Sequence, residues 1–589
     1  MSNDNNGFIN CFFKYIASCF LVLSSLGISA QEKDKETLET ETVVVVKAYT
    51  PAISDANKLK AKPIERDSIA LSKKPVEYQI NSVPVASTFT PAKGKAAKVE
   101  KPKKEKLYNN YATLGVGNYT NVLGEFYSNF ELSRSDNFGV YLKHNSSQGG
   151  IDSIPLANNY YDTDLNLNFS SRQRDVSYGI DFGVTHQLYN WYGLPSDLVA
   201  TEEELNAIDP QQTYLGVALG GNVTFEDTAF KEAILQFRHF RDAYDSSENH
   251  VVIRPTFEFP VGDEQVTGRV ILDYVGGSFR QELNLAVGDS SKYSIFNAGF
   301  HPSFTMLKED LTLNIGAAAF VSLDAQNNKN RFLIYPKVTA SYRLVDEVVI
   351  AYAGLEGDLV QNTYYKTVQE NPFVSPALLI APTDQQYNGY LGLKGRVTNS
   401  VGYNFKAGYV SEQGKPLFMK NMTVLATDPE VTENYNYGNS FGYVYDDVNT
   451  VSATAGLNFD IKSNFKLGVE GTFYSYATDE QAEAWNLPSF KASILANYQI
   501  TPQWYFDAQL YFIGERKALF TPTVIALEQQ IVTLDSYVDA NLTLGYRFTD
   551  RLSFFVKGNN LAGDSYQKWL DYPVLGLQVM GGATYKFDW

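Results

Sequence analysis

Cysteine and histidine are scarce in this 589-residue chain, and no apolar run after residue 30 is long enough for a membrane helix. The only cysteines are Cys11 and Cys19, so the rest of the chain has no disulfide framework and no thiolate chemistry. The five histidines, at positions 144, 186, 239, 250 and 301, show no metal-ligand spacing. Basic residues are outnumbered, since the formal net charge is −17, and this disfavours nucleic acid as a partner.

The first thirty residues have the features of a secretory signal peptide. Lys14 supplies a positive charge, an apolar run extends from Ile16 to Ile28, and the small residue Ala30 provides a cleavage site. We predict cleavage after Ala30 and export of a cysteine-free mature chain. A lipoprotein anchor at Cys19 is the alternative, but apolar residues continue beyond that cysteine.

Charge is divided unevenly along the chain. Residues 31–106 hold sixteen Lys or Arg and eleven Asp or Glu, a net charge of +5. Since the whole chain is −17 and residues 1–30 are neutral, residues 107–589 must carry −22. We interpret residues 31–106 as a short, poorly structured periplasmic leader that ends in a basic linker, Lys93 to Lys106. Docking of this linker on an anionic surface is the alternative.

Residues 107–589 contain about 22 segments in which apolar and polar residues alternate, as in β-strands with two different faces. In the segment 538–548, Leu542 and Leu544 share one face, and Asn541 and Thr543 share the other. Aromatic residues make up 14% of the chain, more than one soluble core needs. They suit a membrane barrel with aromatic girdles at both interfaces.

The connections between these segments alternate between short and long. Ten are tight polar turns, at Ser135–Asn137, Arg172–Asp175, Glu226–Asp227, Gly262–Glu264, Lys308–Asp310, Asp346–Glu347, Thr398–Ser400, Lys462–Asn464, Thr501–Gln503 and Thr549–Arg551. The intervening connections are mostly long, such as 191–210, 361–386, 411–440 and 520–530. Short periplasmic turns and long outer loops are typical of outer-membrane barrels. We therefore predict an all-β fold, a transmembrane antiparallel β-barrel of about 22 strands over 107–589, rather than a sandwich or propeller.

The last predicted strand ends on an aromatic residue. Tyr585, Phe587 and Trp589 share one face with Leu575 and Leu577. Such an ending resembles the signal that barrel-assembly machinery recognises; the alternative is an ordinary last strand.

The chain resembles the barrel of the TonB-dependent receptor family in three respects. The first is the strand count. The second is the block Gly558–Leu561, Tyr566 and Asp571–Pro573, which is similar to the family's C-terminal motif, although Leu577 stands where the family usually has arginine. The third is the TonB-box-like stretch near the mature N-terminus, made of Glu41, Thr42, Val43, Val44, Val45 and Val46.

The resemblance implies an energy-transducing TonB-type partner that binds this stretch by β-strand addition, which β-branched valines favour. A short structural strand below the barrel is the alternative. Family members carry a folded plug between the box and the barrel, whereas only Lys47 to Lys106 is available here. We therefore interpret the chain as a plug-less relative. We expect the leader to fill the periplasmic half of the lumen and inward-folded outer loops to close the outer half.

Catalytic patterns are weak. The stretch Gly438–Gly442 matches the letters of a nucleophile elbow without its strand-then-helix context. His144 and Ser146 lie near one another, but no acid partner is identifiable for a barrel lipase. We predict no enzyme activity, no cofactor and no metal.

One long connection has a composition suited to ligand stacking. In 431–447, five aromatic residues interleave with Asn and Asp: Tyr435, Tyr437, Phe441, Tyr443 and Tyr445. Aromatic faces beside carboxylates suit a polar ligand such as a sugar or peptide; the alternative is strands that extend above the membrane.

Two functions remain open. The first is an outer-membrane receptor or channel for a polar solute. The second is a non-transporting barrel subunit of an assembly, secretion or surface-anchoring complex, with envelope lipoproteins or other barrels as partners. Outer-membrane lipid surrounds the chain in either case.

Overall fold

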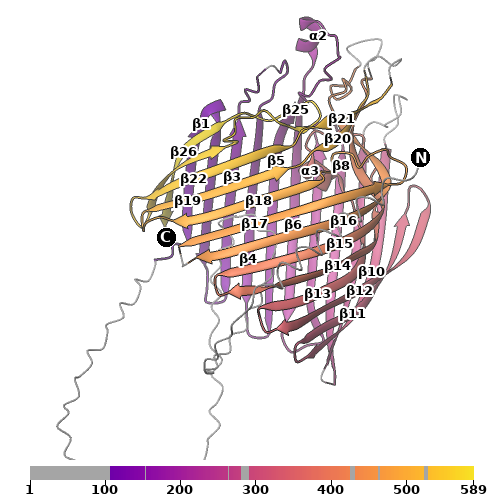
Figure 1. Cartoon of the computed structure of the whole chain (residues 1–589), viewed down its shortest axis with the longest axis vertical. Helices are drawn as coiled ribbons and strands as arrows, with labels where there is room; N and C mark the ends of the chain where they lie inside the picture. The colour runs from indigo at the N-terminus through magenta and orange to yellow at the C-terminus, as the bar shows by residue number, and fades with distance from the viewer. Residues whose placement is uncertain are drawn as a thin grey trace, which may run out of the picture. The chain divides into compact units, whose positions relative to one another are not determined.

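The computed structural model describes residues 106–152, 154–262, 264–279, 291–424, 432–461, 464–522 and 528–589. Residues 107–589 were predicted to form one barrel, and the described strands pair into a single antiparallel sheet of 22 strands. The sheet closes because β1 pairs with both β2 and β26 (Figure 1). The predicted fold class and strand count are confirmed.

The barrel strands are β1 (Asn110–Gly117), β2 (Val122–Glu131), β3 (Asp136–Ser147), β4 (Tyr160–Arg172), β5 (Val176–Asn190), β6 (Gln211–Phe225), β7 (Phe230–Asp242), β8 (Ser247–Val261), β9 (Glu264–Phe279), β10 (Ser291–Lys308), β11 (Leu311–Asp324), β12 (Lys329–Val345), β13 (Val349–Val360), β14 (Thr383–Thr398), β15 (Val401–Lys420), β16 (Phe441–Ile461), β17 (Phe465–Thr478), β18 (Phe490–Gln499), β19 (Trp504–Ile513), β22 (Tyr537–Arg547), β23 (Leu552–Asn559) and β26 (Gln578–Phe587). Two further hairpins lie outside the barrel sheet: β20 (Arg516–Phe520) with β21 (Gln530–Leu534), and β24 (Gln567–Trp569) with β25 (Tyr572–Pro573).

Helices are few in the described chain. They are η2 (Asn118–Thr120), α2 (Glu202–Ala207) and α3 (Tyr364–Glu370). None of the helices in this part of the chain has the length and apolarity needed to cross a membrane.

The alternation predicted from the sequence sets the two faces of the sheet. Large apolar side chains such as Phe182, Leu219 and Phe473 are exposed on the outer face, where a membrane barrel meets lipid. The intervening positions point inward and are mostly polar. Asp164, for example, accepts a hydrogen bond of 2.8 Å from the Thr185 hydroxyl of the next strand. The predicted lumenal acids, Asp162, Asp164, Asp181, Glu470 and Asp539, all lie on these inward positions.

The two rims differ as predicted. All ten tight turns join strand ends at one rim, which we call the short-turn rim, and Asn110 and Phe587 pair with each other there. The opposite, long-loop rim carries the long connections (Figure 1). The long loops begin or end differently from the prediction, since β15 extends to Lys420 and β14 begins at Thr383. Residues 411–420 and 383–386 therefore belong to strands that continue beyond the lengths expected.

Aromatic rings lie flat on glycines of the inner wall. A Cβ atom on Gly545 would lie 1.9 Å from the Tyr505 ring across the strand pair, and one on Gly354 would lie 2.4 Å from Tyr390. Glycine in a strand exposes backbone, and a neighbouring ring that covers it restores packing. Some inward-facing glycines are therefore covered by aromatic rings that line the lumen, and a larger residue would not fit there.

The C-terminal aromatics cover the seam where the barrel closes. The Trp589 ring stacks on Phe130 at 5.9 Å, and its indole N–H donates to Ser128 Oγ at 3.0 Å. Phe587 packs against Trp589 at 5.2 Å. Leu575 was expected on this same face, but it is buried in the cluster of loops at the other rim because β26 begins only at Gln578.

Candidate functional site

Four long connections meet at the long-loop rim and pack against one another. We call the described parts of these connections, 191–210, 361–382, 432–440 and 560–577, the lid. Their apolar side chains form one buried cluster with inward residues of the wall, including Tyr214, Phe240 and Phe441. Trp191 and Phe441 are 0% exposed, as in the core of a domain. Inward folding of the outer loops was predicted, and this core closes the long-loop end of the barrel.

Tyr572 joins three parts of the lid. Its ring stacks on Phe373 at 4.0 Å and lies 4.8 Å from Tyr192. Its hydroxyl donates to the backbone carbonyl of Asn439, and burial raises the pKa of this phenol well above its usual value, so it remains a donor. Gly193 admits the ring, because a Cβ there would lie 2.2 Å from it.

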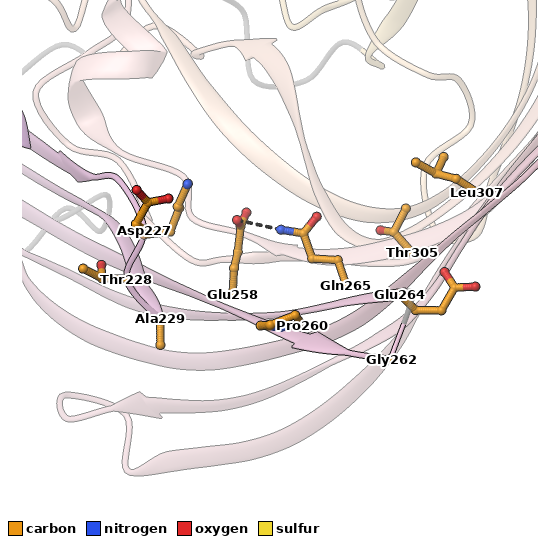
Figure 2. Close-up of a pocket in the computed structure, with 11 residues that line it drawn as sticks. Asp227, Thr228, Ala229, Glu258, Pro260, Gly262, Glu264, Gln265, Thr305 and Leu307 are labelled. Carbon is orange, nitrogen blue, oxygen red and sulfur yellow. Dashed lines mark hydrogen bonds between the residues drawn. The ribbon is translucent and has the colours of Figure 1, made fainter. Parts of the chain in front are cut away.

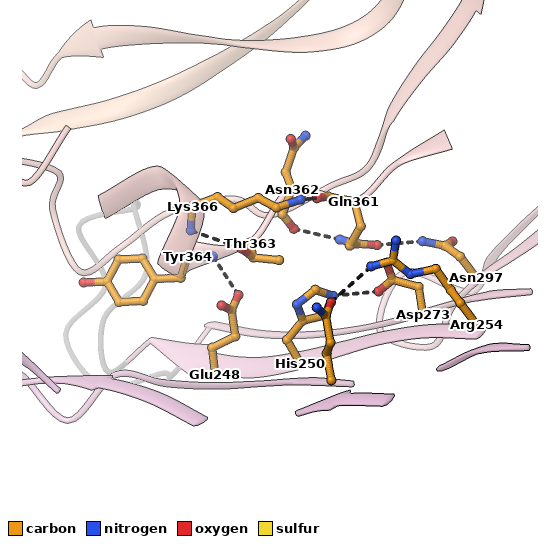
Figure 3. A network of polar contacts seen from close by, with 11 residues as sticks. Glu248, His250, Arg254, Asp273, Asn297, Gln361, Asn362, Thr363, Tyr364 and Lys366 are labelled. Atoms are coloured by element: carbon orange, nitrogen blue, oxygen red, sulfur yellow. Dashed lines mark hydrogen bonds and ion pairs between the residues drawn. The ribbon is translucent and has the colours of Figure 1, made fainter. Parts of the chain in front are cut away.

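Helix α3 is attached to the inner wall by two carboxylates, and Figure 3 shows one of them, Glu248, beside Tyr364. Glu248 of β8 accepts hydrogen bonds from the backbone N–H groups of Tyr364 and Tyr365, at 2.6 and 3.1 Å, and from the Tyr293 hydroxyl at 2.8 Å. Asp242 of β7 accepts from the Tyr364 hydroxyl at 2.7 Å. Burial raises the pKa of Tyr364 well above its usual value, so this phenol stays protonated and keeps donating.

Further polar contacts hold the rest of the 361–382 loop. The Tyr214 hydroxyl donates to the Pro372 carbonyl at 2.8 Å, and Gln369 donates to Gln187 of β5 at 2.9 Å. Nearby, Lys420 at the end of β15 forms a buried ion pair with Asp571. The lid is thus fixed to opposite sides of the wall by specific side chains.

Below the lid, the inner wall is polar and carries both signs of charge. His250 Nε2 lies 2.8 Å from Asp273, and Lys337 lies 3.1 Å from Asp358. Figure 3 shows His250 and Asp273 beside Arg254 on the wall under α3. Asn297 donates to Gln361 of the lid at 2.7 Å. A polar solute would therefore meet hydrogen-bonding groups along this wall, and the lumen is more mixed in charge than its predicted acids suggested.

A shallow hollow of about 600 Å³ lies at the short-turn rim. Figure 2 shows Glu258, which accepts a 2.7 Å hydrogen bond from Gln265, with Asp227, Glu264 and Thr305 around it. This acidic surface is formed by the turns after β6 and β8 and by the end of β10.

Of the five residues singled out as a ligand loop, Tyr435 and Tyr437 lie in the lid. Phe441, Tyr443 and Tyr445 belong to β16 and contact the lid from the wall. Tyr435 is buried against Trp191, with ring centroids 5.5 Å apart, and Phe441 is fully buried. The Tyr443 hydroxyl donates to Thr367 at 2.5 Å, and the Tyr445 hydroxyl donates to the Leu379 carbonyl at 2.8 Å. Tyr437 is half-buried against the same cluster. These aromatics join loops in the closed barrel, so ligand stacking by them needs the lid to move.

The C-terminal motif also has a structural explanation. The Asn560 side chain donates to the carbonyls of Asp564 and Leu575, at 2.8 and 2.9 Å, and so closes the last loop on itself. Tyr566 stacks on Tyr537 at 3.8 Å and donates to Asp539 at 3.2 Å. Together with Tyr572, these residues anchor the last long loop.

Other predicted sites are only partly placed. The stretch 41–46 lies outside the described residues. His144 Nε2 lies 3.2 Å from the Ser146 hydroxyl, and its Nδ1 lies 2.7 Å from Thr163, all on the outward face. Among the described residues, no group of three or more His, Cys, Asp or Glu is arranged to hold a metal ion. Glu248 and Asp242 were missed, because alternation places them inward but does not say which loop they bind.

No model of a known protein family matches the sequence, and no curated protein matches it. Solved structures do. The ferripyoverdine receptor of the outer membrane of Pseudomonas aeruginosa matches with a TM-score of 0.59 at 13% identity, over 83% of this chain and 72% of that one. The siderophore receptor PirA from Acinetobacter baumannii matches with a TM-score of 0.60 at 12% identity, over 82% and 81%. The ferric-catecholate import receptor Fiu from Escherichia coli K12 matches with a TM-score of 0.56 at 10% identity, over 82% of each chain.

The fold is that of outer-membrane receptor barrels. The barrel and these neighbours support an outer-membrane location. All three neighbours are receptors by their descriptions, and at this level of identity the likeness concerns the fold.

Proposed function

We propose that this chain is an outer-membrane barrel that binds a polar solute and passes it inward, with the lid as its outer gate. In this orientation the short-turn rim faces the periplasm. The observation that carries the proposal is the attachment of α3 to the wall through the side chains of Glu248 and Asp242. Such contacts can break while the strand ladder stays intact, so the lid can open without unfolding the barrel.

Conductance in planar lipid bilayers tests the gate. The double variant Glu248→Ala/Asp242→Ala removes the wall acceptors of α3. We expect more frequent openings than in the wild type, and Glu258→Gln at the far rim serves as the matched control. If the double variant opened no more often than the wild type, the lid would not be the gate.

We also propose that Glu41 to Val46 binds a TonB-type energy transducer by strand addition. Val44→Pro removes a ladder donor and should abolish that binding. A pull-down with the periplasmic domain of a transducer, wild type against variant, provides the measurement. Absence of binding by the wild-type leader would remove energised uptake from the proposal.

A second candidate is a non-transporting subunit of an envelope complex. It is favoured by the burial of the lid core, where Trp191 and Tyr572 are as buried as residues in the core of a domain. Gentle purification from native membranes distinguishes the two candidates. A complex subunit should bring lipoproteins or other barrels in stoichiometric amounts, and a solitary receptor should not.

A further inference from the structure

Histidines are concentrated on one side of the outward face, near the long-loop rim. His144 lies three residues from the end of β3, His186 four from the end of β5, and His239 three from the end of β7. Each shares its face with exposed apolar residues of the same strand: Leu142, Phe182 and Phe237. Three of the five histidines of the chain therefore point outward at the level where a membrane barrel passes from acyl chains to lipid headgroups.

The side chains around these histidines form two polar lobes. In the first, His144 contacts Thr163 at 2.7 Å and Ser146 at 3.2 Å, and the Tyr161 ring lies between the His144 and His186 rings, at 6.3 and 5.2 Å. In the second, His239 Nδ1 lies 3.0 Å from the side-chain oxygen of Asn249. We call these residues, together with Arg241, the histidine strip.

Arg241 adds a permanent positive charge to the second lobe. It is exposed near the end of β7, and the register places it level with Leu215 of β6 and, one strand further, with His186 of β5. Neighbouring strands are about 4.8 Å apart, so Arg241 and His186 are roughly 10 Å apart along the surface. The two lobes therefore face the same stretch of membrane.

Carboxylates do not interrupt this strip. On the described strands β3 to β8, the acidic residues of the upper half, such as Asp162, Asp242 and Glu248, all occupy inward positions. The chain as a whole has a net charge of −17, so a patch with one arginine, three imidazoles and no acid is unusual for it. Elsewhere near this rim the outward face carries single charges, such as Lys292 of β10, beside apolar residues such as Phe332 and Val579.

We propose that the histidine strip binds the phosphate group of an anionic outer-leaflet lipid. Guanidinium and imidazole N–H groups are donors suited to phosphate oxygens. The Tyr161 hydroxyl lies 3.5 Å from His186 Nε2 and so helps to orient that imidazole. The apolar residues below, such as Leu142 and Phe237, contact the acyl chains of the same lipid. A soluble anion would contact only the polar donors of the strip. A lipid contacts these donors with its phosphate and the apolar residues below them with its acyl chains. The interaction fixes one side of the barrel against the headgroup layer and is independent of solute passage.

Native mass spectrometry of the full chain in detergent tests this proposal, with phosphatidylglycerol and phosphatidylcholine as probes. We expect the wild type to retain phosphatidylglycerol in preference to phosphatidylcholine. The triple variant His186→Asn/His239→Asn/Arg241→Gln should lower that retention about tenfold, as expected when charge-assisted hydrogen bonds are lost. Salt should weaken retention by the wild type, since the contacts are at the surface.

Lys292→Gln is the matched control, because Lys292 is an exposed, outward-facing basic residue near the same rim but on β10. Heat-dependent migration in gels shows whether each variant has folded. The proposal is overturned if the wild type does not prefer phosphatidylglycerol, if the folded triple variant retains it like the wild type, or if Lys292→Gln reduces retention equally. It is also overturned if millimolar inorganic phosphate displaces the lipid, since the site would then recognise free anion.

Discussion

The carboxylate of Glu248, on the inner wall of β8, accepts a 2.6 Å hydrogen bond from the backbone N–H of Tyr364, the first residue of α3. The first N–H groups of a helix have no acceptor within the helix, and here a side chain of the barrel wall supplies one. Because the side chain of Glu248 is buried, this contact is shielded from water and joins the lid to the barrel.

Glu248→Ala should loosen α3 without unfolding the barrel. The substitution leaves buried donors of Tyr364, Tyr365 and Tyr293 without an acceptor, and each costs about 1–3 kcal/mol. Hydrogen–deuterium exchange of the amides in 364–370 should accelerate at least about tenfold, since a factor of ten corresponds to roughly 1.4 kcal/mol. Glu258→Gln is the control, and exchange that stays at the wild-type rate would contradict the attachment.

Gly545→Ala should destabilise the barrel by about 1–3 kcal/mol, because the new Cβ would occupy the space of the Tyr505 ring. Gly581→Ala is the matched control, since nothing lies within 4 Å of a Cβ there. Urea-dependent unfolding in lipid vesicles gives both values. Combining Gly545→Ala with Tyr505→Ala should remove the clash. If Gly545→Ala lowered the free energy of unfolding equally in the presence and absence of the Tyr505 ring, the steric explanation would be wrong.

Leu542→Arg should cost about 2–4 kcal/mol, because Leu542 lies on the outward face in the middle of β22. Leu467→Arg should cost less, about 0–1 kcal/mol, because Leu467 lies two residues from the beginning of β17 at the short-turn rim. Thr543→Arg faces the lumen and should be tolerated. Folding yields in liposomes rank the three variants. A lower yield for Thr543→Arg than for Leu542→Arg would mean that the two faces are inverted, and equal yields would contradict a lipid-facing Leu542.

Asp571→Asn should destabilise the lid by about 3 kcal/mol, because the buried Lys420 ammonium loses its ion-pair partner and keeps only the more distant Asp197 as a counter-charge. The double variant Lys420→Met/Asp571→Leu should recover much of this loss, since an apolar pair needs no desolvation of charge. Protease cleavage within 560–577 reports lid opening. A single variant that resists the protease like the wild type would show that the pair contributes little.

Trp589→Ala should slow insertion of the barrel more than it lowers its final stability. The indole covers the closing seam by stacking on Phe130 and donating to Ser128, and we propose that it also acts as the assembly signal with Tyr585 and Phe587. Pulse-labelling in cells, followed by heat-dependent migration, measures insertion. Trp589→Phe keeps an aromatic residue at the C-terminus and should insert at the wild-type rate. If both variants were delayed equally, the assembly signal would not depend on an aromatic ring at this position.

The strand count, the two faces and the two rims follow from the sequence. Alternation such as that around Leu542 and Thr543 depends only on the two-residue period of a strand. Turns such as Thr549–Arg551 are short and polar because each closes a single hairpin. These are local properties, and so the inward direction of Asp164 or Asp539 was predicted correctly. The described turns lie where they were predicted except the first, since Asp136 and Asn137 already belong to β3.

The closed lid was decided by tertiary structure. Nothing local distinguishes Glu248 from other inward polar residues, and its partner Tyr364 is more than a hundred residues away. Likewise, Tyr435 and Phe441 have the composition of a ligand surface, yet packing against Trp191 and Trp569 makes them part of a core. Long loops carry no periodic pattern that fixes their direction, so their contacts depend on closure of the barrel, which brings strands distant in sequence around one lumen.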